Sequence, residues 1–423
     1  MAYDTLLSPI KIGNIEVKNR VAMAPMCTQF VSPGGYVNEQ VLAWYAARAK
    51  GGTGLIISGG CYATNEGGES SPFRNMRLAT WHHIAGMSEL AETVHAFGAK
   101  IITQLNTGVG RQGYQNVTGV ELVAPSAIPF SVQDKYNMKR AIEYCHKKGW
   151  ISPYEFLTQG SVPRALTIDE IIATEDKFVE AILRAIRCGF DGVEIHSAHG
   201  YLSHQFLSPR SNYRTDMYGG SRENRFRFLR NLIRKTRERI GHNLEDFVVG
   251  IRISGDEHLE GGFTHEDVKW FCQEAEKEGI DFIHLSDGCY EARNKFLPEE
   301  MDGYKCMLSH AESLSKVVKV PIITPSIHDP EVGEAALKDG KASMVSLGRQ
   351  LIADPEWVNK VSQGKKFVKC IRCGMCLERI IKQLPLRCEV NSNAGNEKYM
   401  PEYNRSNAPN KKVWSLGKLG GKF

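Results

Sequence analysis

Residues 193–225 read VEIHSAHGYLSHQFLSPRSNYRTDMYGGSRENR, and an apolar start passes abruptly into a polar loop. The loop opens with His196, His199, Tyr201 and His204. In parallel α/β folds, the carboxyl ends of buried strands carry the functional side chains. The stretch therefore predicts a strand that ends at His196 and a polar loop that lines a site.

Short apolar runs alternate with helical patterns on both sides of this stretch. The runs are 20–24, 54–58, 100–105, 192–196, 248–253, 282–286, 321–324 and 344–347, and the helical patterns include 38–50, 81–97, 167–188, 221–240, 265–278 and 330–338. Thr167 and Glu170 have the spacing of a helix-starting capping box. Eight apolar strands alternating with helices predict an α/β fold, a parallel (β/α)8 TIM barrel.

A doubly wound open sheet is the main alternative to the barrel. Such a sheet usually has a GxGxxG turn after its first strand, whereas Pro25-Met26-Cys27 follows the first run here. The sequence therefore favours the barrel. In a barrel the ends of different strands meet at one rim, so we expect a shared site there, built from His196, His199, Tyr201, Pro25, Met26, Cys27, Gly60, Gln104, Arg252, Gly348 and Arg349.

Composition excludes several classes of protein. The net charge of +5 comes from basic residues interleaved with acidic ones, which is not typical of a nucleic-acid binder. Residues 1–13 lack the apolar core of a signal peptide, and no run of about 18 apolar residues indicates a membrane span. Eleven cysteines in a long chain do not indicate a disulfide scaffold. We therefore expect a cytoplasmic protein.

Three segments closely resemble the old yellow enzyme family of FMN-dependent ene-reductases. They are EIHSAHGYLSHQFLSPRSNYRTDMYGGSRENR, LLSPIKIGNIEVKNRVAMAPMC and LGRQLIADPEW, and the resemblance covers roughly residues 5–365. It implies FMN at the barrel mouth, with His196 and His199 binding the substrate's electron-withdrawing oxygen and Tyr201 donating a proton. It also implies that Gln104 and Arg252 address the flavin's pyrimidine edge, and that residues 24–27 and Gly60 lie near the ring.

The resemblance implies a phosphate grip formed by Ser326, Gly348 and Arg349. The family's loop after the seventh strand usually contains glycine, whereas this chain reads ITPSIHDP. Cys27 matches a cysteine beside the flavin, and we consider a redox-tuning contact, simple packing and a covalent flavin link. The chemistry independently needs these residue types: two imidazole N–H groups stabilise a developing oxyanion, and a phenol suffices to protonate a carbanion-like centre.

Cys370, Cys373, Cys376 and Cys388 form a Cys-x2-Cys-x2-Cys-x11-Cys pattern. Structural zinc is one interpretation, but three cysteines at successive spacings of three are closer to iron–sulfur ligation. The segment resembles the 4Fe–4S site of the 2,4-dienoyl-CoA reductase and trimethylamine dehydrogenase branch. We therefore expect three parts: an FMN barrel (1–365), a cluster-binding segment (366–400), and a tail or truncated start of a nucleotide-binding domain (401–423).

Three functions follow from these expectations. The first is an ene-reductase that reduces the C=C bond of an α,β-unsaturated carbonyl or enoyl thioester. The alternatives are an oxidative amine dehydrogenase of the trimethylamine dehydrogenase type and an electron-transfer subunit. After Val413 there is no dinucleotide fingerprint, so a separate reductase or direct NAD(P)H would supply electrons. Residues 131–164 are either a lid over the substrate or a surface loop. The sequence identifies neither the substrate nor whether the protein forms a homo-oligomer.

Overall fold

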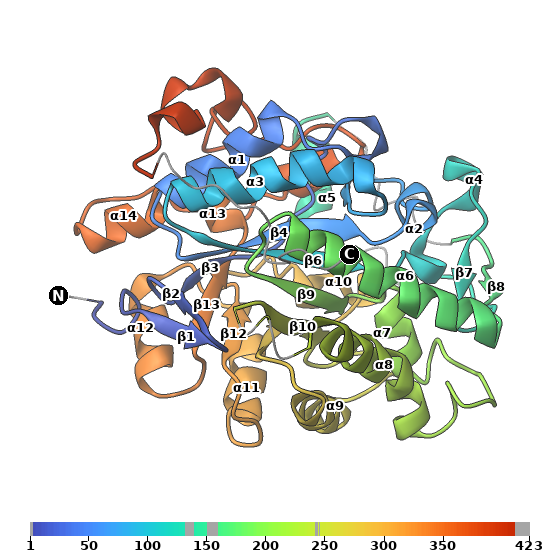
Figure 1. The fold of residues 1–423 in the computed structure, drawn as a ribbon. Coiled ribbons are helices and arrows are strands. Elements are labelled where there is room, and N and C mark those ends of the chain that lie inside the picture. Colours follow the sequence, from blue (N-terminus) through green and yellow to red (C-terminus); the bar gives the residue numbers. More distant parts are fainter. Residues whose placement is uncertain (1–2, 132–138, 150–159, 242–243, 245, 411–423) are drawn as a thin grey trace.

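The structure is a computed structural model that describes residues 3–131, 139–149, 160–241, 244 and 246–410. Its centre is a closed barrel of eight parallel strands in the order β3-β13-β12-β11-β10-β9-β6-β4, and β4 pairs again with β3 (Figure 1). The strands are β3 (Val21–Met23), β4 (Leu55–Tyr62), β6 (Lys100–Asn106), β9 (Gly192–Ser197), β10 (Val248–Ser254), β11 (Phe282–Ser286), β12 (Ile322–Pro325) and β13 (Met344–Leu347). The predicted TIM barrel is confirmed.

Helices surround the barrel and cover the outer faces of its strands (Figure 1). They are α1 (Glu39–Lys50), α3 (Ile84–Ala96), α6 (Ile168–Arg187), α8 (Arg222–Ile240), α9 (His265–Lys277), α11 (Tyr304–Leu314), α12 (Pro330–Lys338), α13 (Arg349–Ala353) and α14 (Trp357–Ser362). Shorter elements in the loops are α2 (Asn65–Glu69), β5 (Met76–Arg77), α4 (Gln115–Thr118), β7 (Val123–Ala124), α5 (Lys139–Lys147), β8 (Arg164–Ala165), α7 (Leu202–Leu207) and α10 (Arg293–Phe296).

Helix α6 illustrates how the sequence specifies these helices. The Thr167 hydroxyl accepts a hydrogen bond from Glu170 N, and the Glu170 carboxylate accepts one from Thr167 N, so the predicted capping box is present. Ile171, Phe178 and Ile182 are buried on one side of the helix. Their spacing of seven and four residues is that of a single helix face, which packs against the barrel.

A hairpin closes the amino end of the barrel. Strands β1 (Ile10–Ile12) and β2 (Ile15–Val17) pair antiparallel, and Gly13 in the turn has a φ of +51°. Ile12, Ile15 and Val17 pack into a buried cluster with inward-facing residues from several barrel strands. The interpretation of the sequence missed this hairpin because strands of three residues are too short to show a period. With this end filled, the open end is the carboxyl one.

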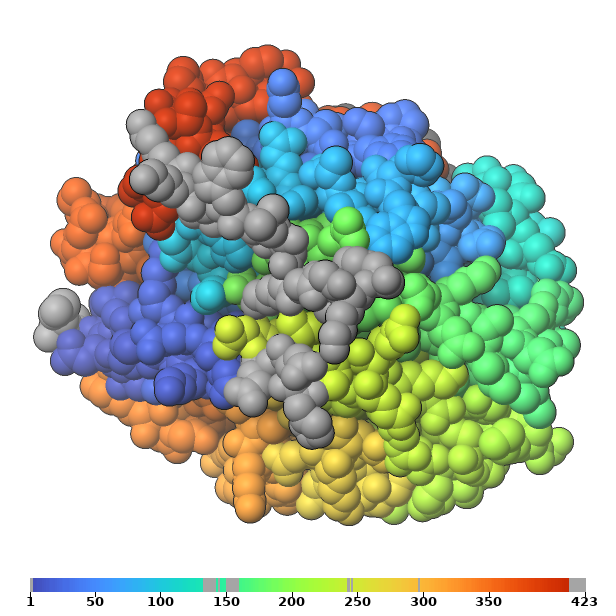
Figure 2. All heavy atoms as spheres, in the orientation of Figure 1, coloured from blue at the N-terminus to red at the C-terminus, as the bar shows by residue number. Residues whose placement is uncertain are grey.

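After α14 the chain leaves the barrel and runs along its side. This segment contains α15 (Met375–Ile381), and its later part, coloured red, lies beside α1 (Figures 1 and 2). The Arg48 guanidinium on α1 binds the Glu397 carboxylate at 2.6 Å, and both side chains are buried. On another face, Leu377 and Ile381 of α15 pack against Ile142 of α5. The extension is therefore packed onto the barrel and onto the loop after β6.

Among the described residues, no helix is both long and apolar enough to cross a membrane. Half of the proposed lid (131–164), residues 132–138 and 150–159, lies outside the described residues, and its described part contains α5. The domain boundaries at 365 and 400 stay predictions.

Candidate active site

A cavity of about 250 Å³ opens at the carboxyl end of the barrel. Ten of the predicted rim residues line it, from six different strand ends: Pro25, Met26, Cys27, Gly60, Gln104, His196, His199, Tyr201, Arg252 and Arg349. Gly348 lies next to two of the predicted residues: a Cβ atom built on Gly348 would be 3.3 Å from Met26 Sδ and 3.9 Å from Ala24 Cβ. The barrel therefore brings together residues that are more than 300 positions apart in the sequence.

His196, His199 and Tyr201 form the polar centre of the cavity wall. The His196 ring centroid lies 5.2 Å from that of His199 and 4.9 Å from that of Tyr201. His196 is the fifth residue of β9, and the other two lie in the turn that follows. His199 and Gly200 have φ angles of 64° and 82°, and this left-handed turn brings Tyr201 back toward His196.

Two residues that the sequence analysis did not single out contact this centre. His199 Nε2 lies 2.5 Å from Ser286 Oγ at the end of β11, and Tyr201 Oη lies 3.0 Å from Tyr290 Oη. Ser286 ends a predicted strand, so the strand-end rule would have found it. Tyr290 lies in the loop beyond, and its sequence position gave no such signal.

Burial sets the protonation states of the polar centre. Loss of solvent and the positive charge of Arg252 lower the pKa of His196 and His199 well below the ordinary value for histidine. Loss of solvent, together with the nearby Tyr290 and Tyr62 hydroxyls, raises the pKa of Tyr201 well above its ordinary value. At neutral pH the site therefore offers two neutral imidazoles and a protonated phenol.

A buried hydrogen-bond chain fixes Gln104. Gln104 Nε2 donates to Glu194 Oε1 at 2.7 Å, Glu194 Oε2 lies 2.7 Å from His284 Nδ1, and His284 Nε2 lies 2.8 Å from Ser346 Oγ. The chain crosses the barrel interior from β6 through β9 and β11 to β13. Gln104 Oε1 is left free of this chain and lies near Gly60: a Cβ atom built on Gly60 would be 3.9 Å from Oε1. Glu194 and His284 were not predicted from the sequence, because isolated positions in the barrel interior carry no motif.

Several features of the wall fit a flat, polar, aromatic ring such as that of FMN. Gln104 presents a fixed acceptor, and a Cβ atom on Gly60 would meet no other atom within 4 Å. The buried Arg252 Nε and His196 Nδ1 have no hydrogen-bond partner within the part of the chain that the structure describes. Since buried polar groups are normally paired, a bound polar molecule would satisfy them.

Of the predicted phosphate grip, Arg349 lines the cavity, whereas Ser326 and Gly348 are not among its lining residues. Ser326 has a φ of 69°, a conformation that favours glycine, so the serine occupies a glycine-like position in a loop that lacks glycine. Its carbonyl accepts a hydrogen bond from Arg372 Nη2 at 3.2 Å. Arg349 Nη2 donates to Pro298 O at 2.8 Å. Arg372, which was not among the predicted residues, thus contacts Ser326 of this grip.

Cys27 borders the cavity with a partly buried thiol. Its Sγ donates a weak hydrogen bond to Arg74 O at 3.8 Å. Loss of solvent raises the pKa of the thiol to about 12, so the sulfur carries its proton at neutral pH. His204, by contrast, is buried away from the cavity wall, and its Nε2 lies 3.3 Å from the buried carboxylate of Glu257.

Cys370, Cys373, Cys376 and Cys388 surround a small cavity of about 20 Å³, and Cys376 also lines the large one. Among the described residues, one group places three possible metal-ligand atoms within 4.8 Å of one another. None of these four cysteines belongs to that group. Tetrahedral zinc with bonds of about 2.3 Å would hold thiolates about 3.8 Å apart. The wider spacing fits a larger inorganic group better than a single zinc ion.

Comparisons with known proteins agree with this geometry. A model of the NADH:flavin oxidoreductase / NADH oxidase family matches residues 5–367. The NADH oxidase of Thermoanaerobacter brockii is 40% identical over 93% of this chain and 57% of that protein. The cinnamate reductase of Clostridium sporogenes is 35% identical over 98% of this chain and 61% of that protein. A 2-naphthoyl-CoA reductase complex, 28% identical, aligns with a TM-score of 0.82 over 95% of this chain and 59% of that one.

The chain therefore spans little more than half the length of these relatives. The family match covers the whole barrel and all the rim residues described above. Old yellow enzyme homologues and morphinone reductase share the fold as well. The chain belongs to the NADH:flavin oxidoreductase / NADH oxidase family.

Proposed function

We propose that this protein is an FMN-dependent ene-reductase, which reduces a C=C bond conjugated to a carboxyl, thioester or ketone group. The observation that carries the proposal is the convergence of two neutral imidazoles and a protonated phenol on one wall of the cavity. Bound FMN supplies the hydride. The roles of the protein's own residues follow from their contacts.

His196 and His199 bind the oxygen of the conjugated group. Reduction of the alkene places negative charge on that oxygen, and fixed N–H donors in a site with little water stabilise such charge strongly. Because both imidazoles are neutral, each offers one N–H and no net charge of its own. The Ser286 hydroxyl beside His199 Nε2 orients that ring.

Tyr201 supplies the proton to the α-carbon. Its raised pKa keeps the phenol protonated, and a carbanion-like centre is far more basic than a phenolate. The Tyr290 hydroxyl, 3.0 Å away, provides a path for a replacement proton. Gln104 and Arg252 hold the polar edge of the flavin, and the Arg252 charge offsets negative charge on it.

The lining of the cavity favours an aromatic or acyl substrate with anionic character. Apolar walls come from Phe73, Phe130 and Leu297, while Arg252 and Arg293 supply positive charge. The cinnamate reductase and the 2-naphthoyl-CoA reductase, two of the relatives above, are named for an aromatic acid and an aromatic acyl thioester. Both are planar conjugated molecules with a carboxyl-derived oxygen.

Amine oxidation is the second candidate. The rings of Tyr201 and Tyr290, with centroids 5.7 Å apart, would suit a cation. The guanidinium groups of Arg252 and Arg293 in the same cavity oppose a positively charged substrate, so this function ranks below alkene reduction.

We further propose that Cys370, Cys373, Cys376 and Cys388 hold a 4Fe–4S cluster. Their sequence spacing and their position around one small cavity support it. Cys376 borders both the small cavity and the large one, so a cluster there would lie beside the flavin site. Such a cluster would pass electrons one at a time to that site.

Product analysis under anaerobic conditions tests the proposed function. Protein reduced with dithionite is mixed with cinnamate, an enoyl-CoA or an enone, and oxidised protein is mixed separately with tertiary and primary amines. We expect reoxidation of the flavin and one saturated product per flavin in at least one alkene mixture. Flavin reduction by an amine, with no reaction of any alkene, would overturn the proposal in favour of amine oxidation.

A further inference from the structure

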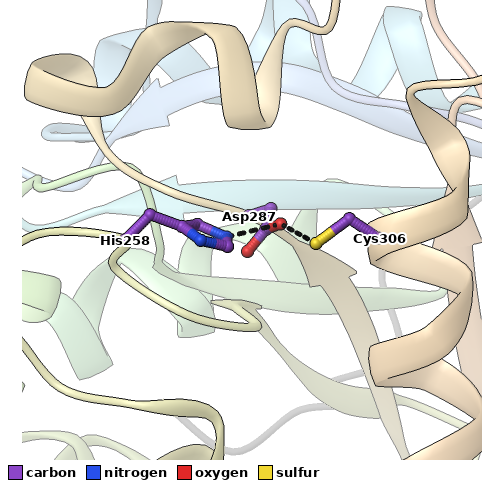
Figure 3. A group of neighbouring side chains, drawn as sticks. All are labelled: His258, Asp287 and Cys306. Atoms are coloured by element: carbon purple, nitrogen blue, oxygen red, sulfur yellow. Dashed lines mark hydrogen bonds and ion pairs between the residues drawn. The ribbon is translucent and has the colours of Figure 1, made fainter.

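We propose that His258, Asp287 and Cys306 form a binding site for a divalent transition-metal ion, with zinc as the best match. The three side chains converge from three separate elements (Figure 3). His258 lies in the loop after β10, Asp287 directly follows β11, and Cys306 is in the first turn of α11. Their ligand atoms all lie within 4.8 Å of one another.

The distances around Asp287 suit an ion held between the three groups. Asp287 Oδ2 lies 2.9 Å from His258 Nε2 and 3.3 Å from Cys306 Sγ. The other carboxylate oxygen, Oδ1, accepts hydrogen bonds from the backbone N–H groups of Asp256 and Gly288 at 3.1 and 3.2 Å. Oδ2 is thus turned toward the imidazole and the thiol.

Hydrogen bonding satisfies only part of the cluster: Cys306 Sγ donates to Asp287 Oδ2, but two of the surrounding imidazole nitrogens are left without a hydrogen bond in the described residues. His258 Nε2 is buried near the Asp287 carboxylate. The imidazole ring is nevertheless oriented so that Nε2 forms no hydrogen bond within the described part of the protein. His310 Nδ1 is also buried without a hydrogen-bond partner there, 3.7 Å from Asp287 Oδ1. Asp287 is fully buried, and the ion pairs that it makes are with these two imidazoles. A cation would neutralise the carboxylate and accept the lone pair of His258.

The donor set indicates the class of metal. One nitrogen, one oxygen and one sulfur are borderline-soft ligands that suit zinc and its neighbours, whereas magnesium and calcium prefer oxygen alone. Three protein ligands leave a fourth tetrahedral position for water. Binding would release the Cys306 proton to solvent, because the thiolate is the ligand.

The backbone around the site is shaped to hold the ligands. His258 has a φ of 56°, an unfavourable conformation for a residue with a side chain, and its N–H donates to Asp256 Oδ1 at 2.6 Å. A Cβ atom on Gly255 would lie 2.3 Å from His310 Nδ1, so only glycine allows α11 to approach this closely.

A metal here would support the active site without touching it. Asp287 follows Ser286, whose hydroxyl contacts His199. Ser254 Oγ accepts from His199 N at 3.1 Å and donates to Gly288 O at 2.6 Å. An ion that joins β10, β11 and α11 would fix the strand ends that position His199.

The test is zinc binding by the whole protein, measured by elemental analysis and by zinc X-ray absorption. Holoprotein is dialysed against micromolar Zn²⁺ and then against metal-free buffer. We expect about one zinc per chain, with one sulfur at about 2.3 Å and the remaining ligands nitrogen or oxygen at about 2.0–2.2 Å. Zinc should also raise the Tm, since a ligand that binds only the folded state stabilises it.

Matched variants separate this site from the other cysteines. His258→Ala and Cys306→Ser should each lose the retained zinc and its effect on Tm, while His82→Ala, at an exposed histidine, and Cys188→Ser, at a buried cysteine, should keep both. Flavin content reports whether each variant folds. Zinc retained equally by all four variants, zinc surrounded by sulfur alone, or no retained zinc in the wild type would each overturn the proposal.

Discussion

Tyr201 is the residue on which the proposed proton transfer depends. Its hydroxyl contacts the Tyr290 hydroxyl at 3.0 Å, and burial keeps it protonated. We predict that Tyr201→Phe leaves flavin reduction nearly unchanged but slows reoxidation by an alkene roughly 10²- to 10⁴-fold, the usual contribution of a positioned acid. Anaerobic stopped-flow absorbance measures the two half-reactions separately.

Tyr290→Phe is the matched control, because it removes the neighbouring hydroxyl and leaves the proposed acid in place. Its effect on reoxidation should be much smaller than that of Tyr201→Phe. An unchanged rate in Tyr201→Phe would assign the proton to another group.

The buried histidines and tyrosine also predict a pH dependence. The pKa of His196 and His199 lies below the ordinary value of about 6.5, and that of Tyr201 lies above about 10. Between these limits none of the three groups changes charge. The single-turnover rate of alkene reduction should therefore be flat from about pH 6.5 to about pH 10. A bell-shaped profile with a limb inside this window would contradict the assigned protonation states.

At the scale of single residues, the residues at the rim of the cavity were predictable from the sequence, but the buried residues that hydrogen-bond to them, directly or through a neighbour, were not. His196, Gln104 and Arg252 sit at or near strand ends, and the alternation of elements is enough to locate those. Glu194 and His284 face the barrel interior, and their contact depends on the register of strands that are not adjacent in the sheet. No sequence motif marks Cys306, which is exposed and contacts Asp287, because that contact depends on how α11 docks against the barrel.

At the scale of elements, the extension and the barrel have separate tasks. The four cysteines of the extension lie after the last barrel strand, and the barrel closes through β3 and β4 without them. We predict that Cys373→Ala loses the iron while flavin binding and far-UV circular dichroism remain those of the wild type. Iron analysis after anaerobic purification measures the loss.

Cys188→Ser is the control for this prediction, because Cys188 is a buried cysteine that lies outside the four-cysteine motif. It should retain about four irons per chain. Stoichiometric zinc in the wild type, bound by four sulfurs and without iron, would contradict the cluster.

Helix α1 anchors the extension through a buried ion pair. Arg48 also donates to Leu351 O at 3.1 Å and to Trp44 O at 2.9 Å. Glu397→Gln would leave the Arg48 charge buried without its counterion, and breaking a buried pair costs about 3–5 kcal/mol. We expect a loss of about 3 kcal/mol in the free energy of unfolding, measured by urea denaturation.

Glu66→Gln provides the comparison, because the Glu66–Lys177 pair is exposed. Exposed pairs contribute little, so this variant should unfold like the wild type. Equal effects of the two substitutions would show that Glu397 does not anchor the extension.

Most barrel elements were predictable from the sequence, although β4 (Leu55–Tyr62) ends four residues beyond its expected run, 54–58. The boundaries of β10, β11 and β13 differ from the expected runs by at most one residue, and α12 matches its pattern. The hairpin of β1 and β2 was not predictable, since its stability comes from packing against the barrel end rather than from a local pattern.

At the scale of the whole molecule, the barrel gathers a cavity of about 250 Å³ at one end, with His196, His199 and Tyr201 in its wall. The extension adds the four cysteines beside that cavity. The central proposal is that flavin bound in the cavity faces a substrate oxygen held by His196 and His199.

Titration of the oxidised holoprotein with a phenol tests this claim most directly. A phenolate stacked on the flavin, with its oxygen at the two histidines, should give a long-wavelength charge-transfer band that saturates. Removing one charge-assisted hydrogen bond costs about 1.5–3 kcal/mol, so His196→Ala and His199→Ala should each weaken phenol binding roughly 10- to 100-fold. A wild-type protein that shows no band, or variants that bind phenol as tightly as the wild type, would contradict the account.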